Sequence, residues 1–491
     1  MPIYQKPEPT ISRNEISPLI LEQTTVMPNV PLSFSRESLG LSADLIRKYN
    51  QPAPRYTSYP TALKFKTIED RSSRSALLAD LEDAGGPLSL YVHVPYCRSL
   101  CWFCGCAKII STDTSLADKY LDYLEVEVRR YSELIRKGRK VVQLHFGGGS
   151  PNFLSPKQIK RLSSILRGSF EFDEEAEISV ELDPRTLSEA QVAAFMELGI
   201  NRASIGVQDV NRKVQEAIHR IQPTATNAKT IGWLREAGIN SINVDLIYGL
   251  PHQTEESFKE TLQEVLSYDA DRLAVFSYAH VPWSKPAQKI LERSPLPGAD
   301  SKIEILIQTV EKLTGCGYAH VGMDHFAKLE DPMVKAQQSK TLQRNFQGYS
   351  LHANVDICAF GMSAISQSQN AFRQNHKDLD TYYSMLDEGS IPLEKGYLLT
   401  RDDQIRREVI MRLMCDLELD FAERGIVNGI DFSSYFGSEL ESLRGMESDG
   451  LVRLSESGLS VTPLGRLLIR NVASRFDAYM GNAAQSFSKA I

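Results

Sequence analysis

Four cysteines lie close together just after an apolar run at residues 88–94. They are Cys97, Cys101, Cys104 and Cys106, which gives the spacing C-x3-C-x2-C-x-C. Three thiolates can hold three irons of a cubic iron–sulfur cluster and leave the fourth iron free to bind a small molecule. We therefore expect Cys97, Cys101 and Cys104 to be metal ligands.

A structural zinc site or a disulfide is the alternative interpretation of these cysteines. Zinc-binding cysteine pairs are usually followed by a second, distant pair, and no such pair follows here. The intervening Trp102 and Phe103 are large and apolar, which suits a redox cluster that must be shielded from water. These features favour the cluster.

A glycine loop and four polar residues are further candidates for binding a polar ligand. Glycines 147–149, followed by Ser150, expose backbone amides, although a tight turn between a strand and a helix would also explain them. Asp245 lies inside an apolar run, where an ionisable group is costly unless it is paired or contacts a ligand. The others are Glu181, Gln208 and Arg220. A neighbouring cation would equally explain Glu181, and an exposed salt bridge at a helix end would equally explain Arg220.

The remaining histidines and cysteines carry weaker signals. His93 and His145 end strands near the cysteines, and we expect them to orient ligands or to fill polar core positions. Cys316, Cys358 and Cys415 are isolated, so we expect them to be buried apolar residues.

The elements that must position these residues alternate from about residue 86 onward. The pattern predicts strands at 88–94, 141–146, 177–182, 202–205, 241–246 and 272–276, with helices at 117–137, 156–169, 188–198, 224–237 and 255–267. Such alternation indicates parallel strands with crossover helices, in a partial barrel or a doubly wound sheet. Six strands fall short of a complete eight-fold barrel. The candidate residues follow successive strand ends, where both architectures bind ligands.

The flanking regions differ in character. Residues 1–42 are rich in Pro, Ser, Thr and Asn and predict a flexible arm, and residues 43–85 predict a segment that covers the active site. We assign residues 86–385 to the catalytic barrel and 396–480 to a mostly helical, winged-helix-like domain, with helices at 401–417 and 464–475 around a hairpin. A packing role for this domain is favoured over DNA binding because the chain is acidic.

Composition limits the function classes. The 491 residues are 42% hydrophobic and 24% charged, with a net charge of −7, which argues against general nucleic-acid binding. No apolar run is long enough to span a bilayer, and the start lacks a secretory pattern. Seven cysteines, four of them crowded, fit a reducing cytoplasm better than a disulfide framework.

With the segment from Tyr91 to Cys106, the chain resembles the radical S-adenosylmethionine superfamily, and more closely the oxygen-independent coproporphyrinogen III oxidases, or coproporphyrinogen dehydrogenases. The similarity extends to segments 55–60, 147–151, 243–251, 323–327, 345–349 and 399–403, and so runs from about residue 43 to the end. Ser150 stands where threonine is usual, a change that keeps the hydroxyl. The resemblance implies an α/β fold: a partial six-fold (β/α) barrel with a mostly helical C-terminal domain.

The resemblance also implies the cofactors. These are a [4Fe-4S] cluster on Cys97, Cys101 and Cys104 and two molecules of S-adenosylmethionine. The family's binding positions correspond to Tyr91, Phe103, Gly148, Gly149, Ser150, Glu181, Gln208, Arg220, Asp245, Ala279 and Ile365. Tyr91, Glu181 and Cys106 are the candidate catalytic residues, and Cys106 is not expected to hold the cluster.

The implied reaction is the anaerobic oxidative decarboxylation of two propionates of coproporphyrinogen III, through a 5′-deoxyadenosyl radical. We expect a cytoplasmic monomer that receives electrons from a reductase or a flavodoxin-like protein. Two alternatives remain: a related radical enzyme that acts on another tetrapyrrole, and a haem-binding carrier without this activity.

Overall fold

The centre of the protein is a curved parallel sheet, as the sequence predicts. The computed structural model describes residues 34–83, 85–480 and 487–491, so residues 1–33 of the predicted arm lie outside the described part. The six predicted strands are present and pair in parallel in chain order: β2 (Leu88–Val94), β5 (Val141–Gly148), β6 (Phe172–Leu182), β7 (Arg202–Gln208), β8 (Ser241–Tyr248) and β9 (Arg272–Ser277).

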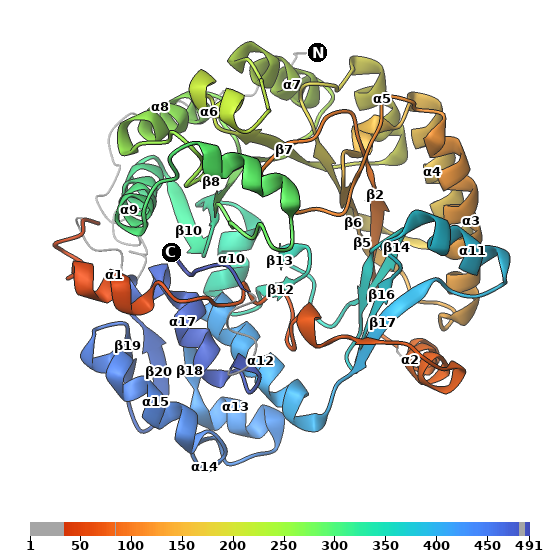
Figure 1. The fold of residues 1–491 in the computed structure, drawn as a ribbon. Helices are drawn as coiled ribbons and strands as arrows, with labels where there is room; N and C mark the ends of the chain where they lie inside the picture. Colours follow the sequence, from red (N-terminus) through yellow and green to blue (C-terminus); the bar gives the residue numbers. More distant parts are fainter. Residues whose placement is uncertain (1–33, 84, 481–486) are drawn as a thin grey trace, which may run out of the picture.

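Crossover helices cover the convex side of this sheet (Figure 1). They are α3 (Leu116–Leu134), α4 (Pro156–Ser169), α5 (Glu189–Leu198), α6 (Arg212–Ala217), α7 (Thr224–Glu236), α8 (Glu255–Leu266) and α9 (Ala299–Gly315). Helix α4 begins where predicted because Ser155 and Gln158 form a reciprocal capping box and Pro156 occupies the first turn. Ser188 and Thr254 cap α5 and α8 in the same way.

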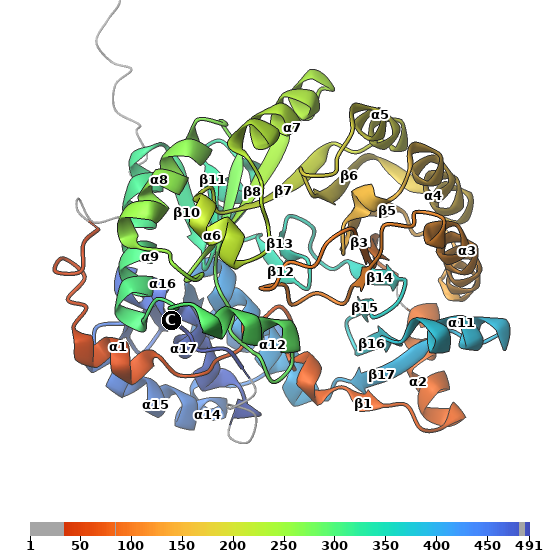
Figure 2. The same cartoon turned by 45° about the horizontal axis from the view of Figure 1, so that its top comes forward.

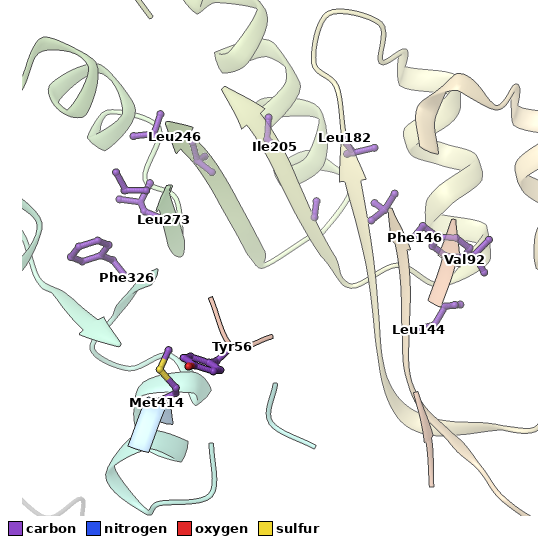
Figure 3. Packing of buried hydrophobic residues seen from close by; sticks show 14 of the residues in the cluster. Tyr56, Val92, Leu144, Phe146, Leu182, Ile205, Leu246, Leu273, Phe326 and Met414 are labelled. Atoms are coloured by element: carbon purple, nitrogen blue, oxygen red, sulfur yellow. The ribbon is translucent and has the colours of Figure 1, made fainter. Parts of the chain in front are cut away.

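Side chains alternate strictly between the two faces of the sheet. One row of register neighbours, Val92, Phe146, Val180, Ala203 and Ile242, is fully buried in the core that also contains the helix side chains (Figure 3). The residues that alternate with them point to the concave side and are mostly polar. The helices therefore hold the sheet by an apolar core, while the concave face is left for chemistry.

The sheet extends beyond the predicted strands at both edges. The strand β14 (Asp356–Phe360) pairs in parallel with β2, and β15 (Ile365–Gln367), β16 (Ala371–Asn375), β17 (Leu393–Leu398) and β1 (Lys66–Thr67) continue in antiparallel order. At the other edge β11 (His325–Lys328) pairs antiparallel to β9, and β10 (Tyr318–Gly322) pairs antiparallel to β11. The described residues thus form one 13-stranded sheet.

Short elements fill the open side of the barrel and the loops. A hairpin of β12 (Gln343–Asn345) and β13 (Gly348–Ser350) lies inside the opening (Figure 2). Helix α10 (Pro332–Gln338) packs against β10 and β11, and α11 (Leu379–Asp387) packs against α3 at the edge of the barrel. The strands β3 (Tyr96–Cys97) and β4 (Ile109–Ile110) form a small parallel pair at the cysteine motif. The N-terminal segment contributes α1 (Ala43–Tyr49) and α2 (Arg71–Asp83).

The C-terminal region is mostly helical, with a three-stranded sheet. It contains α12 (Arg401–Asp416), α13 (Phe421–Asn428), α14 (Phe432–Tyr435), α15 (Gly437–Ser448) and the strands β18 (Glu418–Asp420), β20 (Gly458–Val461) and β19 (Val452–Leu454). The single helix predicted at 464–475 is wrong: α16 (Pro463–Leu467) and α17 (Ile469–Ala473) are separated by Leu468, whose φ of −112° is not helical. None of the helices in the described part of the chain has the length and apolar character needed to cross a bilayer.

Candidate active site

A cavity of about 380 Å³ lies on the concave side of the sheet and extends from the carboxyl ends of the strands into the barrel, as far as Arg202 and Arg272, the first residues of β7 and β9. Twelve of the predicted site residues line it: Cys97, Cys101, Phe103, Cys104, Cys106, Gly148, Gly149, Ser150, Glu181, Gln208, Arg220 and Asp245. Tyr91, Ala279 and Ile365 are not among the lining residues. The structure therefore brings most of the predicted site residues together at one cavity, from positions that lie up to about 150 residues apart.

The cysteine loop enters the cavity after β3. Ser150 Oγ donates a hydrogen bond to Cys97 Sγ at 3.6 Å, and the guanidinium groups of Arg185 and Arg220 each lie 3.5 Å from Cys101 Sγ. Two cations beside this sulfur stabilise a thiolate and the negative charge of any cluster attached to it.

The arrangement of these sulfurs suits a cluster better than a single ion. Among the described residues, no three His, Cys, Asp or Glu side chains converge as the ligands of one metal ion do. A cubane instead takes each of its thiolates on a separate iron. All seven cysteines are free of disulfides, so their sulfurs are available as ligands of a cluster. The donor set therefore fits a [4Fe-4S] cluster.

Cys106 lies beside Cys104 at the edge of the cavity. The contact between these two sulfurs lowers the pKa of Cys104 to about 6 and raises the pKa of Cys106. Cys106 is exposed, unlike Cys101, which is buried. Cys316, predicted to be buried, is also exposed because it follows the last turn of α9 at a surface loop, whereas Cys358 and Cys415 are buried as predicted.

Gly148 and Gly149 form a glycine cradle, a space beside the cysteine loop that the side chain of any other residue would fill. Gly148 has a φ of +104°, and a Cβ atom there would lie 2.5 Å from the His93 ring. A Cβ atom on Gly149 would lie 2.7 Å from the backbone of Pro95 and Tyr96. Only glycine allows the end of β5 to pass this close to the cysteine loop and still expose its backbone to a ligand.

Glu181 is held at the end of β6 as a carboxylate. It accepts hydrogen bonds from His145 Nε2 and from the Gly148 amide, both at 3.3 Å. Burial raises its pKa, but His145 and the Gly148 amide outweigh burial, so that the pKa of Glu181 lies below its usual value. Its side chain is still 45% exposed, so its oxygens are open to a ligand.

Tyr91 supports this carboxylate from outside the cavity lining. Its ring stacks on that of His145 with 5.9 Å between centroids, and its hydroxyl lies 3.1 Å from His93 Nδ1. Ser179 Oγ lies 2.6 Å from His145 Nδ1, which fixes the ring on its other side. His145 therefore positions the Glu181 carboxylate, in line with the first of the two roles, orienting ligands or filling a polar core position, that the sequence left open for it.

Asp245 lies on β8, across the cavity from the glycine loop. It accepts hydrogen bonds from Ser204 Oγ at 3.0 Å and from Asn243 Nδ2 at 2.7 Å. Burial, and then the charge of Glu181, raise the pKa of Asp245 to about 7. Two carboxyl groups with opposite pKa shifts thus face one cavity, as in many enzyme active sites.

Arg220 is buried, with 6% of its surface exposed, so the alternative of an exposed salt bridge is wrong. It donates to the Gly206 carbonyl at 2.7 Å and pairs with Asp183 at 3.3 Å, and its Nε has no partner among the described residues. Gln208 has a φ of +70° where the β7–β8 ladder shifts register, which turns its side chain into the cavity. Asp183 and Arg185 escaped prediction, although Asp183 shares the face of Glu181.

One side chain joins two predicted positions that are far apart in the sequence. Gln288 Nε2 donates to the Phe103 carbonyl at 2.9 Å and to the Ala279 carbonyl at 3.2 Å. Ala279 lies two residues after the end of β9, so the cysteine loop is tied to the carboxyl end of this strand. Ile365 lies on β15, next to the strand that pairs with β2.

Comparisons with known proteins agree with this geometry. Residues 91–265 match the Radical SAM superfamily, and residues 399–468 match the HemN C-terminal domain. The chain is 43% identical to the oxygen-independent coproporphyrinogen III oxidase of Synechocystis over 92% of this chain and 99% of that protein. It is 45% identical to the Escherichia coli protein of the same name, over 93% and 100%. The solved structure of coproporphyrinogen III oxidase (HemN) from E. coli superposes with a TM-score of 0.83 at 44% identity, and covers 87% of this chain and 97% of that one.

Proposed function

The chain belongs to the oxygen-independent coproporphyrinogen III oxidases, and from this premise we propose that it converts two propionates of coproporphyrinogen III to vinyl groups, giving protoporphyrinogen IX for haem biosynthesis. The observation that carries the proposal is the cavity where a cysteine trio, a glycine cradle and two carboxyl groups meet. The enzyme is a radical S-adenosylmethionine oxidoreductase.

Three cysteines would hold the cluster. We assign Cys97, Cys101 and Cys104 to three irons, with Arg185 and Arg220 beside Cys101 as compensating charge. When bound, the cluster and S-adenosylmethionine supply the reductive cleavage that yields a carbon radical able to remove a hydrogen atom from a propionate. Removal of that atom, of carbon dioxide and of one further electron leaves the vinyl group.

The remaining site residues would bind S-adenosylmethionine and exclude water from the reaction. Glu181 is an ionised acceptor suited to ribose hydroxyls or an ammonium group, and the glycine cradle presents backbone groups beside it. Phe103, Gln208, Arg220 and Asp245 line the opposite part of the cavity. Two molecules of S-adenosylmethionine are part of this proposal, and Tyr91, Ala279 and Ile365 would contribute from beside the cavity. Tyr91, Glu181 and Cys106 remain the proposed catalytic residues.

The setting of the enzyme is also proposed. Free cysteines throughout the described chain fit a reducing cytoplasm. We propose a monomer that receives single electrons from a reductase or a flavodoxin-like protein.

The test is turnover by the anaerobically reconstituted protein. The protein is supplied with iron, sulfide, a one-electron reductant, S-adenosylmethionine and coproporphyrinogen III, and vinyl products and 5′-deoxyadenosine are measured by chromatography. We expect both products. Formation of 5′-deoxyadenosine without vinyl product would show that the substrate is different, and haem binding without cleavage of S-adenosylmethionine would identify a carrier instead.

A further inference from the structure

The interior of the barrel is unusually polar. In closed barrels of this type, branched apolar side chains fill the interior in layers. Here one register row of inward-facing residues reads Glu181, Ser204, Asn243 and Arg272, across the strands β6 to β9. An interior of this kind is built to surround a polar ligand rather than to pack against itself.

The wall opposite the cysteines holds hydrogen-bond donors without partners. Arg272, His325 and Gln347 all line the cavity, and Arg272 Nη1, His325 Nδ1 and Gln347 Nε2 are buried without a partner among the described residues. Arg272 is only 5% exposed. A buried donor that is left unpaired costs about 1–3 kcal/mol, and more for a charged group. The Arg272 and Gln347 nitrogens can only donate, and His325 donates when Nδ1 carries the ring hydrogen, so this wall suits a ligand rich in acceptor oxygens.

The strand register places these groups side by side. His325 on β11 pairs with Ala274, and Arg272 lies two residues before Ala274 on β9, so both side chains project from the same face. Burial, and then Arg344, lower the pKa of His325 to about 4, so its neutral ring carries one N–H. His325 and Gln347 lie in segments 323–327 and 345–349. These segments belong to the family resemblance but contain none of the residues predicted to bind the cluster or S-adenosylmethionine.

Beside this wall, though outside the lining of the cavity, lies one buried arginine that has no carboxylate partner among the described residues. Asp331 accepts two hydrogen bonds from Arg272, at 2.7 and 2.8 Å, and Glu177 pairs with Arg202 at 3.0 Å. Arg344 is 7% exposed and lies over the Tyr349 ring, and it has no carboxylate partner in the described part of the chain. An uncompensated buried cation is expensive unless an anion joins it.

We propose that this wall is a carboxylate subsite, in which Arg272, His325 and Gln347, backed by the charge of Arg344, bind a propionate of the tetrapyrrole. The inference rests on the proposed function and names the substrate contacts for it. Arg272 shares its register row with Glu181 three strands away, a path of about 14 Å at the usual strand spacing. The carboxylate of S-adenosylmethionine has the same chemistry, so the test separates the two sources.

The test compares Arg272→Lys with Arg139→Lys in the reconstituted holoenzyme. Lysine keeps the charge beside Asp331 but removes the free Nη1. Arg139 is a matched control because it is buried, pairs with Asp356 at 2.6 Å and also has an unpartnered Nη1, but does not line the cavity. The ligands are coproporphyrin III, its tetramethyl ester and S-adenosylmethionine, with binding followed by fluorescence or equilibrium dialysis.

We expect Arg272→Lys to raise the Kd for coproporphyrin III about tenfold, the effect of one charge-assisted hydrogen bond. The affinities for the ester and for S-adenosylmethionine should not change, and Arg139→Lys should change none of the three. Gln347→Met, which removes only the amide, should weaken the binding of coproporphyrin III and leave the binding of the ester and of S-adenosylmethionine unchanged. If Arg272→Lys does not fold, this second variant still tests the proposal.

Three results would overturn the inference: unchanged coproporphyrin III binding in the folded variants, equal weakening of acid and ester, or weakening confined to S-adenosylmethionine. The first would mean that water satisfies these donors. Failure of the proposed function looks different. In that case the wild type would bind the acid selectively but form no vinyl product.

Discussion

Raising the pH is expected to weaken the fold through one buried carboxyl group, Glu127 on α3. Its side chain accepts hydrogen bonds from Tyr382 Oη at 2.6 Å, Asn375 Nδ2 at 2.6 Å and the Gly361 amide at 2.8 Å. These contacts join α3 to the strand β16 and to the turn between β14 and β15. Glu127 is fully buried, and burial outweighs the three hydrogen bonds and raises its pKa from 4.5 to about 7.

The sign and size of the effect follow from this shift. Because the folded protein holds this proton more tightly than the unfolded chain, the stability it contributes is fully present below about pH 4.5 and is lost as the pH rises through about 7. One pKa unit corresponds to about 1.4 kcal/mol, so the rise from 4.5 to about 7 corresponds to about 3 kcal/mol. Asp209 and Asp245, whose pKa values are raised to about 6 and about 7, act in the same direction, so the contribution of Glu127 must be isolated by substitution.

The assay is urea unfolding of wild type and Glu127→Gln at several pH values between about 4 and 8.5, a range that includes both the unfolded pKa of 4.5 and the folded pKa of about 7. The glutamine variant should be less stable at low pH, because its amide meets the Asn375 donor, but it should lose about 3 kcal/mol less than wild type as the pH rises. Glu133→Gln, an exposed position on the same helix, is the control and should follow wild type. Parallel loss of stability in wild type and Glu127→Gln would refute the reasoning.

Three further outcomes are expected. Cys97→Ser should abolish the cubane absorption and EPR signals after reconstitution, whereas Cys316→Ser should keep them; a cubane in the first variant would remove Cys97 from the ligand set. Gly148→Ala should cost at least about 1 kcal/mol from the positive φ alone. It should also suppress 5′-deoxyadenosine formation through contact with His93, and a variant with normal melting and turnover would contradict the cradle. His145→Phe should keep the stacking on Tyr91 but weaken S-adenosylmethionine binding about tenfold, because Glu181 loses its donor. Unchanged binding by dialysis would show that His145 does not position that carboxylate.

The catalytic half of the fold was predictable because its strands are apolar on one face and are separated by capped helices. Residues 88–94 and 156–169 were predicted at their observed bounds, since the apolar run and the Ser155–Gln158 box define them locally. The flanking strands β14 to β17 were not predicted. They are short, and pairing with β2 and with one another, rather than local pattern, makes them strands.

The candidate site was predictable only where the type of a single residue already indicates its chemistry. The spacing of the crowded cysteines identified Cys97 directly, whereas Gly148 gained weight from its place after the cysteine motif, because a tight turn would also explain the glycine loop. Arg185 and Gln288 were missed because their roles come from contacts across 84 and 185 positions of chain, and no local spacing encodes such distances. Arg220 was left open for the same reason, and only its burial decided between the two interpretations.

The double hydrogen bond of Gln288 has a mechanical consequence. Its side-chain amide donates both to the backbone of the cysteine loop and to the backbone just after β9, so movement of either segment away from Gln288 would break one of the two hydrogen bonds. The position of the cysteine loop and that of the backbone after β9 are therefore linked through this one amide, and a substitution of Gln288 would free both segments together.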